Sequence, residues 1–212
     1  MPDLSRERRF LSASVSRICG VDEAGRGPLA GPVVAAAVIL PDVKARQGGL
    51  PRKIASRLDD SKKVIPALRQ ELARALAEHS MTGVGVVSVE DIDRLNILQA
   101  TLLAMQRAVA SLPGKPCLVL VDGNRTPRLE CPAHAIVDGD ALSLSIAAAS
   151  IVAKVHRDGI MADLAAKYPA YGWERNQGYG TPEHLEALRR HGPTPHHRCT
   201  FAPVAQYALF AE

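Results

Sequence analysis

The 212-residue sequence has few aromatic side chains, few cysteines and no long hydrophobic run. Aromatic residues make up 4% of the chain, so aliphatic side chains and alanine must fill the core. The four cysteines are widely scattered and form no C-x-x-C pair, which argues against a zinc ribbon or a redox motif. The longest purely aliphatic run, residues 33–40, is too short to cross a membrane.

The remaining composition is that of an ordinary globular domain, with 47% hydrophobic and 23% charged residues. Scattered free thiols fit a reducing compartment, so we expect a cytoplasmic protein without membrane attachment. Arg8-Arg9 has a faint likeness to an export signal, but residues 12–17 supply no hydrophobic stretch to complete it. The net charge of +4 permits a polyanionic partner without requiring one.

The length of the chain indicates one domain. We expect a flexible tail over residues 1–16, a core over residues 17–167 and a C-terminal helical segment of the same domain over residues 168–212. Residues 42–57 contain glycine and proline and are predicted to form a loop.

Apolar runs and periodicity predict the regular elements. Strands are expected at residues 17–22, 32–40, 81–89, 117–122 and 134–137. Helices are expected from an N-cap at Ser61, and over residues 90–112, 143–167 and 182–191. Because the strands come first as a group and then alternate with helices, the pattern favours an α/β fold with a mixed sheet and helices on its faces.

Three of the predicted strands lead into acidic residues. Asp22 and Glu23 follow the first strand, Asp122 ends the fourth, and Asp140 comes shortly after the fifth. A carboxylate at the end of a buried strand is costly unless it pairs or binds a cation, and Mg²⁺ prefers oxygen ligands. These four acids would balance two divalent ions, so the pattern predicts a metal site.

Two of these acids also have simpler interpretations. Asp122 precedes a glycine, and Asp-Gly is a common turn. Asp140 could be the N-cap of the helix expected over residues 143–167.

Several basic and polar residues could contact a phosphodiester. In Gly25-Arg26-Gly27 the glycines allow a close backbone approach, and arginine meets phosphate with a planar fork. Lys62 lies where a predicted helix begins, and helix N-termini attract phosphate. The simpler interpretations are a plain turn and a solvated lysine.

Two further residues are candidates for substrate contact. Lys154 lies one helical turn past Ser150 in a helix rich in small residues, so it could face the sheet; a solvated lysine is the alternative. Tyr179 stands between two glycines, which exposes its ring for stacking on a sugar or base, although most loop tyrosines do not stack.

Taken in order, these motifs resemble the ribonuclease HII family, the type 2 ribonucleases H, from Cys19 to about Val204. The opening motif, G-V-D-E-A-G-R-G-P-L-A-G-P-V, is similar to that of the family almost letter for letter. The other matching blocks are D-S-K-K at residues 60–63, V-D-G-N at 121–124, G-D at 139–140, the small-residue block at 145–155, R-D at 157–158, G-Y-G-T at 178–181, and the ending at 196–204.

The resemblance implies a ribonuclease H-like fold with a mixed central sheet. It also implies hydrolysis of the RNA strand of RNA–DNA hybrids and cutting on the 5′ side of ribonucleotides in duplex DNA, the chemistry of ribonucleotide excision repair. Catalysis with two metal ions would leave a 3′-hydroxyl and a 5′-phosphate. We expect the enzyme to act as a monomer, with the C-terminal segment contacting substrate.

By the same resemblance, four acids would hold two Mg²⁺ or Mn²⁺ ions, a glycine–arginine loop would read the 2′-hydroxyl, and a tyrosine would stack on the sugar at the RNA–DNA junction. The residues concerned are Asp22, Glu23, Asp122 and Asp140 for the metals, Gly25, Arg26 and Gly27 for the hydroxyl, and Tyr179 for the sugar.

The sequence departs from the family pattern at Asp138, where lysine is common. An acid there could repel Asp140 or compete with it as a ligand. Two rival functions stay open at this point. One is another two-metal nuclease of the same fold, such as a junction resolvase, and the other is a catalytically silent hybrid-binding module.

Overall fold

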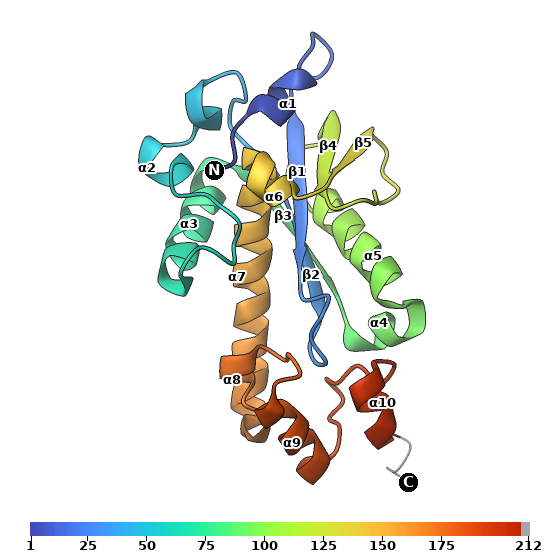
Figure 1. Ribbon diagram of the computed structural model, residues 1–212. Helices are drawn as coiled ribbons and strands as arrows, with labels where there is room; N and C mark the ends of the chain where they lie inside the picture. Colours follow the sequence, from blue (N-terminus) through green and yellow to red (C-terminus); the bar gives the residue numbers. More distant parts are fainter. Residues whose placement is uncertain (209–212) are drawn as a thin grey trace.

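The computed structural model describes residues 1–208, and its centre is a five-stranded mixed sheet (Figure 1). The strands lie in the order β3-β2-β1-β4-β5. The pairs β1–β2 and β2–β3 are antiparallel, whereas β1–β4 and β4–β5 are parallel. The α/β class with a mixed sheet is therefore confirmed. The strand bounds are β1 Ile18–Ala24, β2 Val33–Ile39, β3 Met81–Val87, β4 Leu118–Asp122 and β5 Ala133–Ile136.

Helices cover both faces of the sheet because its central strands are apolar on both sides. Strand β2 is buried along its whole length, and its alternate side chains enter two separate clusters. Ala36 and Val38 pack toward helices α3 (Pro66–His79) and α7 (Leu144–Lys167), whereas Ala35 and Ala37 pack toward α5 (Ile97–Ala110). The small alanines allow both helical layers to lie close to the strand.

Helix α7 is the longest element, with 24 residues, and it runs alongside β1 toward the C-terminal helices (Figure 1). Ser143 caps its N-terminus, because the Oγ atom accepts a hydrogen bond from the Ile146 amide at 3.3 Å. The start of α7 presses against β1 at Gly20, where a Cβ atom would lie 2.2 Å from the Ser145 backbone. The prediction of a small-residue helix over 143–167 is confirmed.

Two predicted helix boundaries were wrong. The helix expected from Ser61 begins at Pro66, because residues 60–64 form turns in which Asp60 accepts the Lys62 amide at 2.9 Å. The single helix expected over residues 90–112 is divided into α4 (Val89–Leu95) and α5. Asn96 separates them with a φ of 69°, a conformation that asparagine tolerates, and its side chain caps α5.

Regular structure also occurs where the sequence analysis expected a tail and a loop. Helix α1 (Ser5–Arg9) lies within residues 1–16, and its Glu7 is buried. The predicted loop 42–57 contains the short helices η1 (Arg46–Gly49) and α2 (Arg52–Ala55). Both segments pack on the core through Leu4 of the first and through Leu50 and Ile54 of the second.

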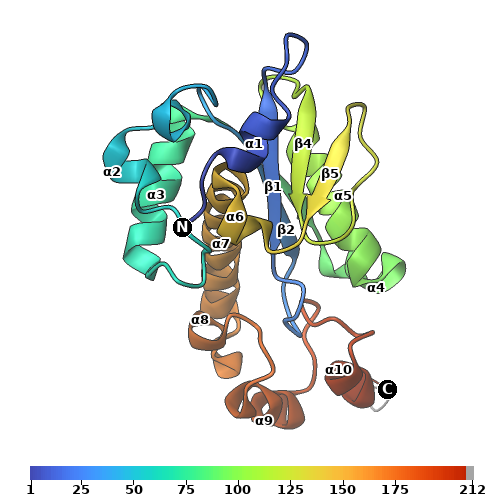
Figure 2. The same ribbon diagram turned by 45° about the horizontal axis from the view of Figure 1, so that its top comes forward.

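The C-terminal helices gather at the far end of α7, away from α1 and α2 (Figure 2). The helix predicted over residues 182–191 is confirmed as α9. The division of the chain into core and C-terminal segment stays a prediction. No helix within residues 1–208 is long and apolar enough to span a membrane. The remaining bounds are α6 Gly139–Leu142, η2 Pro169–Tyr171, α8 Trp173–Asn176, α9 Pro182–His191 and α10 Ala202–Ala208.

Candidate active site

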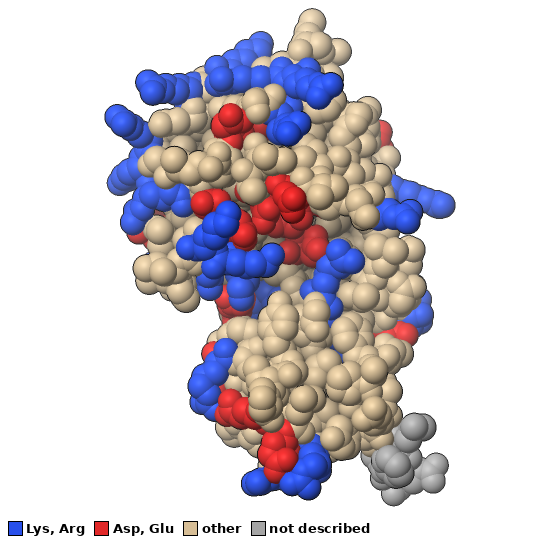
Figure 3. Space-filling model, in the orientation of Figure 1, with Lys and Arg blue, Asp and Glu red and all other residues tan. Residues whose placement is uncertain are grey.

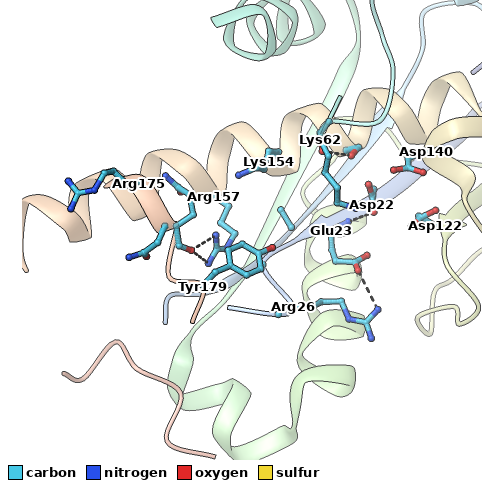
Figure 4. Close-up of a pocket in the computed structure, with 17 residues that line it drawn as sticks. Asp22, Glu23, Arg26, Lys62, Asp122, Asp140, Lys154, Arg157, Arg175 and Tyr179 are labelled. Atoms are coloured by element: carbon cyan, nitrogen blue, oxygen red, sulfur yellow. Dashed lines mark hydrogen bonds and ion pairs between the residues drawn. The ribbon is translucent and has the colours of Figure 1, made fainter. Parts of the chain in front are cut away.

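A cavity of about 440 Å³ lies where β1 and β4 end, between the sheet and the C-terminal helices (Figure 4). The four acids lie at one end of it, with Lys62 and Arg26 beside them, and Lys154, Arg157, Arg175 and Tyr179 lie toward the other end. All ten residues that the sequence analysis selected line this cavity: Asp22, Glu23, Gly25, Arg26, Gly27, Lys62, Asp122, Asp140, Lys154 and Tyr179.

The acidic end forms because two parallel neighbouring strands finish at the same edge of the sheet. Strands β1 and β4 pair in parallel, and Asp122 is the last residue of β4. Asp22 and Glu23 precede the end of β1 at Ala24, after which Gly25 changes the chain direction with a φ of 98°. Asp140 comes from α6, so four acids from three separate segments of the chain meet around one cavity.

Burial and neighbouring acids raise the pKa of three of these carboxyl groups, those of Asp22, Glu23 and Asp140. Burial, followed by the charges of Glu23 and Asp122, raises the pKa of Asp22 well above its ordinary value. Burial also raises the pKa of Glu23, against the opposing effect of Arg26, which lies 3.5 Å from its Oε1 atom. The pKa of Asp140 is raised first by burial and then by Asp122.

Backbone amides hold two of the acids in place. Asp22 Oδ1 accepts a hydrogen bond from the Glu23 amide at 2.7 Å. Asp122 Oδ1 accepts one from the Gly139 amide, also at 2.7 Å, which ties β4 to the beginning of α6. Asp122 is therefore more than a turn residue, and Asp140 does not cap α7, because Ser143 does. The interpretation of Asp140 as the N-cap of that helix was wrong, whereas Asp122 does precede a turn glycine, Gly123, which has a φ of 95°.

The acidic end suits a hard divalent cation, since it offers carboxylate oxygens whose mutual repulsion a cation would relieve. Across residues 1–208, no three histidine, cysteine, aspartate or glutamate side chains are already gathered tightly enough to hold a metal ion. A cation would therefore have to draw these carboxylates toward one another.

Asp138 stands apart from this group. It is exposed, adopts a φ of 54° and does not line the cavity. Burial, Asp122 and Asp60 are the main causes of the raised pKa of Asp140. The expected interference of Asp138 with Asp140 therefore has no basis in the structure.

Lys62 and Lys154 reach the cavity from two elements that are linked by an ion-pair network. Arg69 of α3 donates to the carbonyl oxygens of Ser61 at 2.9 Å and Val64 at 2.6 Å, which fixes the turn that carries Lys62. Arg69 also pairs with Asp158 at 3.5 Å, and Asp158 pairs with Lys154. The sequence analysis assigned no role to Arg69 or Asp158.

Two buried arginines shape the other end of the cavity. Arg198 is 0% exposed and donates to four carbonyl oxygens, those of residues 25, 26, 31 and 32. Arg157 is 1% exposed and donates to the carbonyls of residues 30, 32 and 177. Neither forms an ion pair with a carboxylate within residues 1–208. Burial, helped by the charge of Arg157, lowers the pKa of Arg198 to about 9.

These arginines fix the backbone of the glycine–arginine loop and of the segment before Tyr179. Gly25 is required beside Arg157, because a Cβ atom there would lie 2.1 Å from the Arg157 Nε atom. Both arginines fall in motifs that resemble the family, yet nothing in their spacing shows that they hold carbonyl oxygens. Tertiary contacts that bring loops together leave no local pattern in a sequence.

Tyr179 faces the cavity from a loop held by a buried pair of histidines. Its side chain is half exposed, and its carbonyl oxygen accepts from His184 Nδ1 at 2.9 Å. His184 Nε2 accepts from the Trp173 indole at 3.1 Å and lies 3.0 Å from His197 Nε2. Burial lowers the pKa of both histidines, that of His197 to about 3, and so favours their uncharged forms.

Comparison with known proteins agrees with this geometry. A family model described as Ribonuclease HII matches residues 19–204. The chain is 59% identical over 211 residues to a Ribonuclease HII of Paramagnetospirillum magneticum, a match that covers 99% of this chain and 100% of that one. It is 62% identical to a Ribonuclease HII of Rhodospirillum rubrum, over 97% of this chain and 91% of the relative.

A solved structure shows the same architecture. The crystal structure of the ribonuclease H2 from Pyrococcus horikoshii superimposes with a TM-score of 0.71 and 27% sequence identity, covering 92% of this chain and 98% of that one. The protein is therefore an enzyme, a metal-dependent endonuclease that hydrolyses phosphodiester bonds. Fold, site and sequence together place the chain in the ribonuclease HII family.

Proposed function

We propose that the protein hydrolyses the RNA strand of RNA–DNA hybrids and also cuts on the 5′ side of ribonucleotides embedded in duplex DNA. The products would carry a 3′-hydroxyl and a 5′-phosphate, and the enzyme would act as a cytoplasmic monomer. One observation carries this proposal. The four acids share a single cavity with a glycine–arginine loop and an exposed tyrosine ring. The groups needed for hydrolysis and the groups needed to recognise a ribose therefore lie in the same site.

The acidic end would hold the metals, with Asp22, Glu23, Asp122 and Asp140 as ligands. Two Mg²⁺ or Mn²⁺ ions, when bound, supply a water of lowered pKa and neutralise charge on the phosphate. The protein side chains bring carboxylate oxygens to that place, and within residues 1–208 Arg26 is the one basic residue that forms an ion pair with any of these acids.

The loop Gly25–Gly27 would read the 2′-hydroxyl, the group that distinguishes RNA from DNA at a single nucleotide. Without side chains at two positions, its backbone can approach the sugar closely. Arg198 holds the carbonyl oxygens of Gly25 and Arg26 on the buried side, so the loop presents a fixed surface to the cavity. Such a fixed surface discriminates ribose from deoxyribose, because a deoxyribose would leave the polar groups of the loop without a hydrogen-bond partner.

Three side chains would position the strand around that sugar. Lys62 and Lys154 line the cavity on the side of α7 and would contact phosphate oxygens without regard to base sequence. Tyr179 would stack on the sugar next to the ribonucleotide. Its ring lies beside Gly27, where a Cβ atom would approach the Tyr179 Cε1 atom to 3.4 Å.

The direct test is a nicking assay with Mg²⁺ on a DNA duplex that contains one ribonucleotide. We expect the wild-type protein to cut once, on the 5′ side of the ribonucleotide. Asp122→Asn should lower the rate by about a hundredfold to a thousandfold, since it removes the charge of one proposed metal ligand. The variant should still bind the hybrid, because phosphate contacts lie elsewhere in the cavity.

Asp138→Asn is the matched control, because Asp138 is a nearby acid that is exposed and does not line the cavity. It should retain full activity. Wild-type rates in Asp122→Asn would refute the metal assignment. Faster cleavage of a four-way DNA junction would favour a resolvase, and hybrid binding without cleavage would favour a silent binding module.

A further inference from the structure

Positive charge is concentrated on one part of the surface that lies outside the cavity. We define the basic ridge as residues 5–9, which form α1, together with residues 44–57, which contain η1 and α2. The ridge holds eight lysines and arginines against one acid, whereas the rest of the chain holds 18 against 21. Figure 3 shows the corresponding band of basic side chains across the top and upper left, over α1 and α2.

The charges of the ridge are largely free to act on a partner. Its one acid, Glu7, is buried and bonded to Ser143 and Ser145. Arg8 donates to the carbonyl oxygens of residues 43 and 45, which joins the two segments, and Arg57 pairs with Glu71. The other six basic residues form no ion pair within residues 1–208: Arg6, Arg9, Lys44, Arg46, Arg52 and Lys53.

The ridge is also joined to the active-site cavity at two places. The Asp3 carbonyl accepts from the Leu144 amide at 2.8 Å, and Glu7 Oε1 accepts from the Ser145 amide at 2.9 Å. These bonds fix α1 against the corner between α6, which carries Asp140, and α7. At its other end, residues 52–57 lead into the turn that carries Lys62. Ridge and cavity are therefore connected by backbone hydrogen bonds at one end and by the chain itself at the other.

A duplex in the cavity must extend beyond it, because ten base pairs span about 34 Å. We propose that the basic ridge binds the phosphate backbone of the duplex arm that leaves the cavity past Asp140 and Lys62. This inference rests on the proposed function and adds a second contact region to it. Unpaired lysines and arginines neutralise phosphates and release counterions, which gives affinity that depends on salt and not on sequence.

The test compares substrate lengths. The substrates are a duplex of about 10 base pairs with a central ribonucleotide, and two duplexes of about 30 base pairs with the ribonucleotide near one end or the other. We expect wild-type kcat/KM to be at least tenfold higher on one of the long duplexes than on the short one. A ridge variant, Arg9→Gln with Arg46→Gln, Arg52→Gln and Lys53→Gln, should lose that preference and cut the short duplex at the wild-type rate.

The salt dependence gives a second readout. The slope of log(kcat/KM) against log[salt] on the preferred long duplex should fall by about 0.9 for each phosphate contact that the variant loses. The four side chains are exposed and unpaired, so the variant should unfold at the wild-type temperature.

A charge-matched control separates the ridge from net charge. Arg74→Gln, Arg94→Gln, Lys115→Gln and Lys167→Gln together remove four exposed charges that line no part of the cavity. This control should keep the length preference. The inference is overturned if the ridge variant keeps it too, if the control loses it equally, or if wild type shows no preference. Failure of wild type to cut any ribonucleotide-containing duplex would instead overturn the proposed function.

Discussion

The two ends of the active-site cavity bury charge in opposite ways. At the acidic end, Asp22, Glu23 and Asp140 have raised pKa values because burial and neighbouring acids oppose their ionisation. At the other end, the guanidinium groups of Arg157 and Arg198 are even more deeply buried, yet their donors meet carbonyl oxygens of the surrounding loops. The acidic end carries four carboxyl groups with Arg26 and Lys62 as nearby counter-charge, whereas the buried guanidinium groups of the other end are satisfied by the protein itself.

The comparison separates residues that bind a ligand from residues that hold the scaffold. A buried polar group that the fold satisfies stabilises the protein, whereas one that the fold leaves unsatisfied costs free energy until something else binds it. The acidic end is thus expected to be unstable on its own and to favour cations. The arginine end is expected to be stable and insensitive to them.

The largest expected effect is at the arginine end. Arg198→Met should lower the free energy of unfolding by about 3 kcal/mol or more, because it removes the donors of four carbonyl oxygens, each worth about 1–3 kcal/mol. Urea denaturation measures the change. Arg175→Met removes an exposed arginine from the same cavity and should cost little. Equal losses in both variants would break the distinction between the two ends.

Glu7 tests an intermediate case, because one of its carboxylate oxygens is satisfied and the other is not. Oε1 accepts from Ser143 Oγ at 2.6 Å, from Ser145 Oγ at 2.7 Å and from the Ser145 amide at 2.9 Å. Oε2 is buried without a partner. Glu7→Gln should lower the free energy of unfolding by about 1–2 kcal/mol, since hydrogen bonds to a charged group become neutral ones.

Thermal or urea unfolding checks this prediction against Glu78→Gln, a change on the exposed face of α3 that should be neutral. Unchanged stability in Glu7→Gln would mean that α1 adds nothing to the corner between α6 and α7. That result would weaken the structural link between the basic ridge and Asp140 while leaving the proposed chemistry intact.

The smallest expected effect has the opposite sign. In metal-free protein at neutral pH, Asp22→Asn should raise the free energy of unfolding by about 0.5–2 kcal/mol, because it removes one charge from a repelling group at a functional site. Chemical denaturation in the presence of a chelator measures the gain. A destabilised variant would show that the acidic end is satisfied by the fold after all.

The pH dependence of this gain follows from the direction of the pKa shifts. The folded-state pKa values of Asp22, Glu23 and Asp140 are raised, so the folded protein binds protons more readily than the unfolded chain. Their protonation favours folding below about pH 4, and that contribution is lost as the pH rises through the folded-state values. The gain from Asp22→Asn should therefore grow with pH. At neutral pH, saturating Mn²⁺ should stabilise the wild-type protein more than the variant and so reverse the stability difference between them.

Much of the site was predictable because its signals are local. An apolar run that ends on an acid predicts a strand and, at the same time, a carboxylate at the end of that strand. Asp22 and Asp122 could therefore be identified without tertiary information. Glycines beside Arg26 and Tyr179 mark backbone that approaches a ligand. These patterns were sufficient to select ten residues that the fold brings to one cavity.

The parts that could not be predicted depend on contacts between distant segments. Apolar periodicity continues through Asn96, so nothing local shows that the chain turns there. Ser61 has the side chain of an N-cap, but Arg69 and Pro66 place the start of α3 later. Arg198 holds carbonyl oxygens more than 160 residues away in sequence, a relation that only the folded chain reveals.

Helix α7 gives the cavity a fixed length. It contributes Ser150 and Lys154 near the acids and Arg157 near Tyr179, and the seven helical steps from residue 150 to residue 157 rise about 10 Å along the axis. A helix packed against a sheet keeps a constant length, so α7 fixes the distance between the acids and the end of the cavity near Tyr179. Under the proposed function, the spacing between the cleaved bond and the sugar that Tyr179 contacts is therefore a dimension of the backbone, and an engineered insertion inside α7 is the way to change it.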